Sequence, residues 1–574
     1  MRRAALQLRS LRPQVHRLAR VRQPGHARRA LSTHPMHLRR FSVALVSTVV
    51  ASGAYYAYRG AESPASSPAV QTRSLTSPSA EATASRRAIV VEQGQVYMGS
   101  IPDNEPLSKE TDTQGRRVLE MLTPEQATRK LRKNEESWLV GRGKGVVRYD
   151  VVQIPSNDPI EDDHAEKIIE VPQTVAATEG GPNSDWMFWG VFDGHSGWTT
   201  SAKLRQVLIS FVARELNATY QSALTNPALT IPTPESVDAA IKKGFLRLDH
   251  EIVHEAVNKV NKAQSKSAAA ELLAPALSGS CALLSFYDSR SKLLRVACTG
   301  DSRAVLGRRG GSGKWTATPL SVDQTGASET EAERLRAEHP GEPNVVANGR
   351  VLGRLEPTRA FGDAVYKWSV ETQERIAASY FGRSGGKLMQ TPPYVTAEPV
   401  VTTTKVEPQN GDFLVMATDG LWEMLTNEEV VGLVGRWLEE QARREGAASA
   451  GGSWLGSWFS SAKAGLPVES PVADKDASGQ RSPIRRQQWG LPDDQTGRFV
   501  VEDENAATHL VRNALGGKDS DQLCALLTLQ YPTSRRFRDD LTVEVVFFGD
   551  SGGDGNVSVN QRASASADGL KAKL

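Results

Sequence analysis

The sequence predicts an α+β fold built on a sandwich of stacked, largely antiparallel β-sheets. Three observations support this expectation. The apolar runs are short, about four to eight residues, and either alternate with polar residues or are apolar throughout, as in half-buried and buried strands. Turn-forming residues separate the runs. Acidic residues stand repeatedly where such runs begin or end, which indicates that strand ends gather at one rim of the sandwich.

The composition is that of an ordinary globular protein. The chain has 574 residues, 39% hydrophobic and 24% charged, enough for two or three average domains or one large domain with insertions. Its net charge is +3, but residues 1–40 hold eleven arginines and no acid. The remainder is therefore mildly acidic, and we expect no nucleic-acid partner for it. The three cysteines form no Cys-x-x-Cys pair, which argues against a disulfide framework and a zinc site.

The N-terminal segment has the composition of a targeting sequence. Residues 1–40 are rich in arginine and the first acid of the chain is Glu62, which is typical of a mitochondrial presequence; a basic nucleic-acid arm is the alternative. Residues 41–58 carry no charge and are bounded by Arg40 and Arg59. As a helix they would span about 27 Å, just enough for a hydrocarbon core. They are either an inner-membrane anchor or an apolar extension of the targeting signal.

The rest of the chain divides into a linker, one large domain and a tail. We expect residues 59–115, which begin with a stretch rich in Ser, Ala, Pro and Thr, to be a disordered linker. The domain spans residues 116–549 and contains a low-complexity surface insertion at 441–497. Residues 550–574 are expected to form a disordered tail.

Two short motifs lie near the ends of this region. At the start of the domain, Thr123 can cap a helix, Pro124 suits its first position, and Gln126 completes a capping box. At the C-terminus, the tripeptide Ala-Lys-Leu at 572–574 resembles the peroxisomal address of the Ser-Lys-Leu type. This predicts a minor peroxisomal pool beside the mitochondrial one.

Acidic residues occupy the ends of several apolar runs. The run Trp186–Phe192 leads directly into Asp193 and His195. Further runs give Asp301, Asp419, Asp539 and Asp540, and a proline-containing turn gives Glu161, Asp162 and Asp163. Taken alone, each of these residues is explained equally well by a role in a turn or a helix cap. Together at one rim they would repel one another unless cations lay between them.

The ligand types indicate which cations these would be. Carboxylate oxygens without nearby cysteine and with few histidines select hard ions, magnesium or manganese. Two such ions about 3.5–4 Å apart form a hydrolytic centre that lowers the pKa of water and offsets charge on a phosphoryl group. The sequence therefore predicts a metal-dependent hydrolase.

Five motifs carry a family resemblance. VFDGHSG, TGDSRAVLG, NGRVLGRLEPTRAFGD, ATDGLWE and RDDLTV occur in this order between roughly residues 120 and 549. They resemble the motif series of the metal-dependent type 2C protein serine/threonine phosphatases. LTPEQATRKLRKNEESW, NDPIED, ERLRAEHPGE, TPPYVTAEPVVT and EDENAATHLVRNAL are similar to the mitochondrial pyruvate dehydrogenase phosphatase branch, including its fungal members. The resemblance implies a central sandwich of two antiparallel β-sheets flanked by α-helices.

The resemblance also implies site residues. The implied metal ligands or holders of metal-bound water are Glu161, Asp162, Asp193, the Gly194 carbonyl, Asp301, Asp419 and Asp539. Asp193 is both a ligand and a catalytic residue, and Asp301 matches the position associated with a third, weaker ion. His195 matches the histidine proposed to protonate the leaving seryl or threonyl oxygen, for which an ordinary pKa near 6.5 is suitable. A hydrogen bond to a metal-bound water is its alternative role.

This sequence departs from the family where substrate phosphate binds. The wider family places an arginine at the position of Asn157, so phosphate must be held by something else, either Arg359 or the metals alone. A structural ion pair is the other role open to Arg359. Asp540 stands where the family often has Asn, and Glu423 where it often has Asp; Gln324 is given no role.

We therefore expect a mitochondrial phosphoserine/phosphothreonine phosphatase that uses two Mg²⁺ or Mn²⁺ ions, with a third as a further expectation. The expected partner is a phosphoprotein substrate, pyruvate dehydrogenase E1α. One alternative is the same chemistry on other phosphoproteins, in the intermembrane space or in peroxisomes. The other is an inactive binding scaffold, which the presence of every required acid disfavours.

Overall fold

The structure, a computed structural model, describes most of the chain beyond residue 84. The described ranges are 85–92, 95–102, 116–171, 184–225, 231–382, 388–448, 466–469, 483, 496–550 and 553–565. The presequence, the segment 41–58 and the tripeptide 572–574 lie outside these ranges. Within them, no helix combines the length and hydropathy that crossing a bilayer would require.

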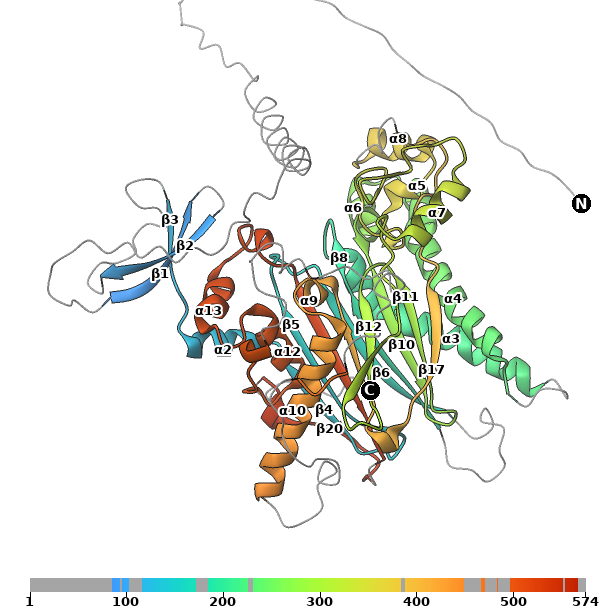
Figure 1. The fold of residues 1–574 in the computed structure, drawn as a ribbon. Helices are drawn as coiled ribbons and strands as arrows, with labels where there is room; N and C mark the ends of the chain where they lie inside the picture. Colours follow the sequence, from blue (N-terminus) through green and yellow to red (C-terminus); the bar gives the residue numbers. More distant parts are fainter. Residues whose placement is uncertain are drawn as a thin grey trace, which may run out of the picture. The chain divides into compact units, whose positions relative to one another are not determined.

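Two antiparallel sheets form the centre of the molecule (Figure 1). The five-stranded sheet has the order β17 (Val400–Lys405), β11 (Leu293–Thr299), β10 (Ala282–Asp288), β7 (Ser184–Phe192), β6 (Asp163–Val171). The seven-stranded sheet has the order β13 (Trp315–Pro319), β12 (Arg303–Arg309), β18 (Phe413–Ala417), β19 (Leu541–Phe548), β5 (Val146–Ile154), β4 (Glu136–Val140), β20 (Val557–Val559). This confirms the predicted sandwich.

Helices cover the outer face of each sheet. Over the five-stranded sheet pack α3 (Thr199–Leu224) and α4 (Pro234–His250); α5 (Ala256–Ala263) and α6 (Lys266–Leu277), reached through one π-helical turn at Glu251–Glu255, extend the same hydrophobic cluster beyond the end of the sheet. Against the seven-stranded sheet lie α2 (Pro124–Arg132), α9 (Asp419–Trp422), α10 (Asn427–Ala448) and α12 (Ala506–Leu515), while α13 (Ser520–Thr528) packs on α2 and α12. The remaining helices, α7 (Glu329–Glu338) and α8 (Val370–Ser379), belong to the segment between β13 and β17.

Short elements complete the described fold. Two-residue strands form small sheets: β8 (Gly194–His195), β9 (Gly279–Ser280) and β16 (Phe361–Gly362) in one, β14 (Val346–Ala347) and β15 (Arg350–Val351) in another. Single 3-10 turns occur at Ala364–Tyr366, Pro408–Asn410, Thr496–Arg498, Ser534–Arg536 and Gln561–Ala563.

Strand β7 shows why its sequence is apolar on both faces. All nine of its residues are buried. Met187 and Trp189 pack between the sheets, while Trp186 and Phe188 pack under the helices α3 to α6. A central strand of a helix-covered sandwich has no solvent face, so the polar alternation disappears.

Helix α2 begins as its sequence predicts. The Thr123 hydroxyl accepts a hydrogen bond from the Gln126 backbone N–H, and the Gln126 side chain accepts one from the Thr123 N–H at 2.8 Å. Pro124 occupies the first helical position. The predicted capping box is confirmed.

The expected disordered linker and tail are wrong in part. Within 59–115, β1 (Ser85–Glu92) and β2 (Gln95–Pro102) form a sheet with β3 (Arg117–Glu120). Within 550–574, β20 pairs with β4. In both places a few alternating apolar residues, such as Ile89 and Val557, outweigh the polar composition of the surrounding segment. The start of the expected insertion, at 441, lies inside α10.

Candidate metal centre

Strand register brings the predicted acidic residues to one rim of the sandwich. In the five-stranded sheet, Phe192 at the end of β7 lies opposite Asp163 at the start of β6. Strand β11 runs parallel to β7, since both are antiparallel to β10, and so it delivers Asp301 to the same edge. In the seven-stranded sheet, Ala417 at the end of β18 lies opposite Val543, near the start of β19. The chain therefore enters or leaves this rim at every predicted acidic motif.

Three of these carboxylates converge. Asp193, Asp301 and Asp419 each offer one oxygen, and the three oxygens lie within 4.8 Å of one another. The Asp419 backbone N–H donates to Oδ2 of Asp193 at 3.4 Å. Asp419 is the first residue of α9, which follows β18 directly. Residues 226 positions apart in the chain thus share one site.

The electrostatics of this cluster favour a cation. Burial, and then the charges of Asp162 and Asp301, raise the pKa of Asp193 well above its ordinary value. Burial also raises the pKa of Asp419 well above its ordinary value, with the charges of Asp193 and Glu423 adding to the effect. Without a counter-charge such a set would hold protons instead of negative charge. A cluster of partly to fully buried carboxylates fits a hard divalent cation such as Mg²⁺ or Mn²⁺.

Asp162 lies beneath the cluster. Its Oδ2 accepts hydrogen bonds from the hydroxyls of Thr418 at 2.9 Å and Thr542 at 2.8 Å. Its side chain is buried, and burial together with the charge of Asp540 raises its pKa to about 8. Asp162 immediately precedes β6, Thr418 immediately follows β18, and Thr542 lies in β19, so these two hydrogen bonds link the rims of the two sheets.

Glu161 and Gly194 border the cluster. Gly194, in β8, pairs with Ser280 of β9. The carbonyl oxygen of Glu161 accepts a hydrogen bond from the Ser201 hydroxyl at the start of α3. Burial, and secondarily the charge of Asp540, raises the pKa of Glu161. Metal ligation by Glu161 and by the Gly194 carbonyl stays a prediction.

Asp539 lies beside the cluster but outside its three-carboxylate core. Gly420, next to Asp419, packs so tightly on the following residue that a Cβ at Gly420 would lie 2.1 Å from the Asp540 carbonyl oxygen. The carboxylate of Asp539 forms an ion pair with Arg535 and accepts a hydrogen bond from the Asp540 N–H at 2.6 Å. Both contacts use Oδ1 of Asp539, so a metal role for this residue, which stays a prediction, would use Oδ2.

Asn157 and Asp540 form one structural unit. The Asp540 carboxylate accepts from the Asn157 N–H at 2.8 Å, from the Asn157 side-chain amide at 2.9 Å, and from the Glu161 N–H at 2.9 Å. The Ser156 N–H also donates to it. Asp540 thus holds the turn that carries Glu161 and Asp162. The amide of Asn157, considered for phosphate binding, is engaged in this support.

Arg359 is engaged in an ion pair. Its guanidinium contacts Glu331 at 2.8 Å and donates to the Glu398 carbonyl at 2.9 Å. Its side chain is only 12% exposed. These contacts favour the structural role over phosphate binding.

His195 stands beside the metal cluster with an acidic partner. Its Nε2 lies 2.6 Å from Oδ2 of Asp363, a residue in a left-handed backbone conformation with φ of 47°. Burial disfavours the charged ring, but the charges of Asp363, Asp301 and Glu161 outweigh it, so the pKa of His195 is raised. Gly279 leaves room for this pair, because a Cβ there would lie 2.1 Å from Nε2 of His195.

Sequence reasoning missed several supporting residues. Asp363 ends the TRAFGD motif but is separated from His195 by 168 residues. Gln324 was given no role, yet it accepts from the Gly300 N–H at 2.7 Å and donates to the Cys298 carbonyl at 3.1 Å, which fixes the turn before Asp301. Thr418 and Thr542 adjoin acidic motifs, and that adjacency was the signal available for them.

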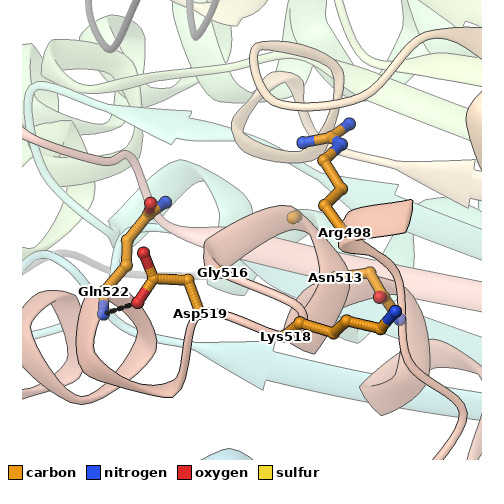
Figure 2. A pocket seen from close by; sticks show the side chains of 7 residues that line it. Arg498, Asn513, Gly516, Lys518, Asp519 and Gln522 are labelled. Atoms are coloured by element: carbon orange, nitrogen blue, oxygen red, sulfur yellow. Dashed lines mark hydrogen bonds between the residues drawn. The ribbon is translucent and has the colours of Figure 1, made fainter. Parts of the chain in front are cut away.

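A separate pocket lies elsewhere on the surface. Its volume is about 350 Å³, and it is lined by Arg498, Asn513, Ala514, Gly516, Lys518, Asp519 and Gln522 (Figure 2). In it the Asp519 carboxylate accepts from the Gln522 N–H at 2.9 Å, a helix cap for α13. This lining contains none of the predicted site residues.

Comparisons with known proteins match this geometry. The family described as Protein phosphatase 2C matches residues 158–450. A protein phosphatase 2C homolog of Schizosaccharomyces pombe is 45% identical over 73% of this chain and 84% of its own length. The mitochondrial pyruvate dehydrogenase (acetyl-transferring) phosphatase 1 of Saccharomyces cerevisiae is 42% identical over 79% of this chain and 78% of its own. The human protein of that name is 32% identical, over 76% and 86%.

Proposed function

The chain belongs to the protein phosphatase 2C family and is a metal-dependent protein phosphatase, and on that premise we propose that it hydrolyses phosphoserine and phosphothreonine in mitochondria with two divalent cations. The observation that carries this proposal is the convergence of Asp193, Asp301 and Asp419 beside the His195–Asp363 pair. A third, weaker cation at Asp301 is part of the proposal.

The proposed chemistry assigns one task to each group. When bound, divalent cations lower the pKa of water and offset the charge of a phosphoryl group. Asp193 and Asp419 would hold them, with Glu161, Asp162, Asp539 and the Gly194 carbonyl completing the site. Asp162 and its two threonines keep the sheets in register, so that the carboxylates stay together.

His195 is the proposed general acid. The Asp363 carboxylate engages Nε2 and favours the imidazolium. This leaves Nδ1 to deliver a proton to the departing seryl or threonyl oxygen. No cysteine takes part as a nucleophile, because Cys281, Cys298 and Cys524 are buried and burial raises the pKa of each thiol.

The proposed substrate is phosphorylated pyruvate dehydrogenase E1α. The support is the similarity to proteins named mitochondrial pyruvate dehydrogenase phosphatase in yeast and in mammals. The same names and the arginine-rich segment 1–40 support a mitochondrial location. An inner-membrane anchor at 41–58 and a peroxisomal pool directed by the C-terminus are further proposals, which protease protection of mitoplasts and a reporter fused to the tail would test.

The test is dephosphorylation of purified phospho-E1α in the presence of Mn²⁺. We expect release of phosphate by the parent protein and none by Asp193→Asn. Activity of the parent on other phosphoproteins but not on E1α would overturn the substrate. Absence of activity on any phosphoprotein, with intact binding to one, would favour the scaffold and overturn the proposed function.

A further inference from the structure

Position 157 carries asparagine where the resemblance to the wider family predicts an arginine that binds the substrate phosphoryl group. The residue at that position, Asn157, spends its side-chain amide on Asp540. The candidate Arg359 is 12% exposed and is paired with Glu331. Beside the proposed cations, an arginine is the residue suited to orient a phosphoryl dianion, because its guanidinium can make a two-point contact with phosphate oxygens.

Arg535 lies at the rim where this cation is needed. It belongs to the 3-10 turn Ser534–Arg536, and its guanidinium contacts the carboxylate of Asp539. Its side chain is 38% exposed, more than three times the 12% of Arg359. Burial raises the pKa of Glu161, Asp162 and Glu423, and the charge of Arg535 opposes that rise in all three, which places it within the field of the site.

Hydrogen bonds fasten the Arg535 turn to the loop of Asn157. The Ser534 hydroxyl donates to the Ser156 carbonyl at 2.6 Å, and the Ser156 hydroxyl donates to the Arg538 carbonyl at 2.8 Å. The Arg538 guanidinium donates to the Pro155 carbonyl at 2.7 Å. Arg535 therefore stands on a segment held against the loop from which the family arginine is missing.

The neighbouring arginine cannot take the same role. Arg538 is 3% exposed, and its guanidinium is directed to the Pro155 carbonyl. It is an anchor of the two segments. Arg535 differs because its partner is a predicted metal ligand. The ion pair uses Nη1 of Arg535 and Oδ1 of Asp539. The other guanidinium N–H groups of Arg535 can therefore donate to an anionic partner while Oδ2 of Asp539 serves a cation.

We propose that Arg535 binds the phosphoryl group of the substrate, in place of the arginine that Asn157 replaces. This inference rests on the proposed phosphatase function. The ligand class is a phosphate monoester dianion, and the inorganic phosphate product has the same chemistry. The contact orients the phosphoryl group against the clustered carboxylates of Asp193 and Asp419.

The experiment compares Arg535→Gln and Arg535→Lys with the parent, using a phosphothreonine peptide and inorganic phosphate in Mn²⁺. For Arg535→Gln we expect KM for the peptide and the inhibition constant of phosphate to rise together, each about tenfold or more. Turnover at saturation should change by less than about threefold. For Arg535→Lys, both constants should lie between those of the parent and of Arg535→Gln, because lysine keeps the charge but loses the planar two-point contact.

Two controls keep the outcome decisive. Arg536→Gln removes the adjacent charge of the same turn and should leave both constants at the parent value. Thermal unfolding of Arg535→Gln, with and without inorganic phosphate, should show a folded protein that phosphate stabilises less than the parent. Unchanged KM and phosphate inhibition would overturn the proposal, as would a change only in the Mn²⁺ concentration needed for activity, since Arg535 would then act through Asp539. An inactive parent would overturn the proposed function instead.

Discussion

At the residue scale, Asp363 determines how His195 can act. Its carboxylate lies 2.6 Å from Nε2 and holds the ring in one orientation. Burial alone would favour the neutral ring, and the acidic neighbours, Asp363 first among them, reverse this and raise the pKa of His195. A general acid must be protonated when the leaving oxygen departs, so the aspartate extends the pH range in which the histidine carries its proton.

Asp363→Asn should lower turnover and change its pH dependence. Loss of the carboxylate lowers the pKa of His195, so the fall of kcat with rising pH should occur at lower pH than in the parent. The loss at neutral pH should be on the order of 10-fold to 100-fold, part of the usual contribution of a positioned acid. The measurement is kcat against pH with a phosphopeptide. Glu374→Gln, at an exposed position of α8, is the control. Identical pH profiles for Asp363→Asn and the parent would contradict the assignment.

At the scale of elements, the two-residue strand β9 places His195 and Asp363 together. It pairs with β8, which contains His195, and with β16, which leads into Asp363. The approach is close enough that a Cβ at Gly279 would lie 2.1 Å from Nε2 of His195 and 2.3 Å from Oδ2 of Asp363. A methyl group there must separate the pair.

Gly279→Ala should therefore cost about 100-fold in turnover, the size of loss that a displacement of about 1 Å can cause. The matched control is Gly311→Ala in the turn between β12 and β13, where a Cβ would meet nothing within 4 Å. The measurement is the turnover of both variants at saturating phosphopeptide. Equal turnover of Gly279→Ala and Gly311→Ala would show that the spacing of the pair does not matter.

The elements also show how far sequence reasoning reached. Strand ends at Asp193, Asp301 and Asp419 were predictable, because period-two or uniformly apolar runs fix where a strand stops. The hydrogen-bond partners that hold the acids in place were not predictable. Those of Asp162 lie 256 and 380 positions away in the chain, and their approach depends on how the two sheets are aligned. Strands β1, β2 and β20 were missed because composition was averaged over segments that contain only a few apolar residues.

At the scale of the whole molecule, folding without a cation forces carboxylates together. Asp162 has a pKa of about 8 in the folded protein, against an ordinary value of 3.8, and the pKa values of Asp193 and Asp419 are also well above ordinary. Between the ordinary pKa of these carboxyl groups and their raised pKa in the folded protein, the folded state therefore binds more protons than the unfolded state. Stability of the metal-free protein should fall as pH rises through this window.

Thermal unfolding of the chelated protein tests this consequence. We expect a lower Tm at about pH 8 than at about pH 5, and a smaller difference when Mn²⁺ is added, because a cation replaces the protons. Asp162→Asn should reduce the pH dependence of the metal-free protein. An equal Tm at both pH values for the chelated parent would mean that the acids are not crowded in solution.

The central claim is that Asp193, Asp301 and Asp419, far apart in the sequence, together bind divalent cations that the reaction needs. The most direct measurement is a calorimetric Mn²⁺ titration of the parent, Asp193→Asn and Asp419→Asn, with phosphopeptide turnover measured on the same samples. We predict that each substitution weakens Mn²⁺ binding by about tenfold or more and abolishes most of the turnover. Equal Mn²⁺ affinity and equal turnover in all three proteins would contradict the claim.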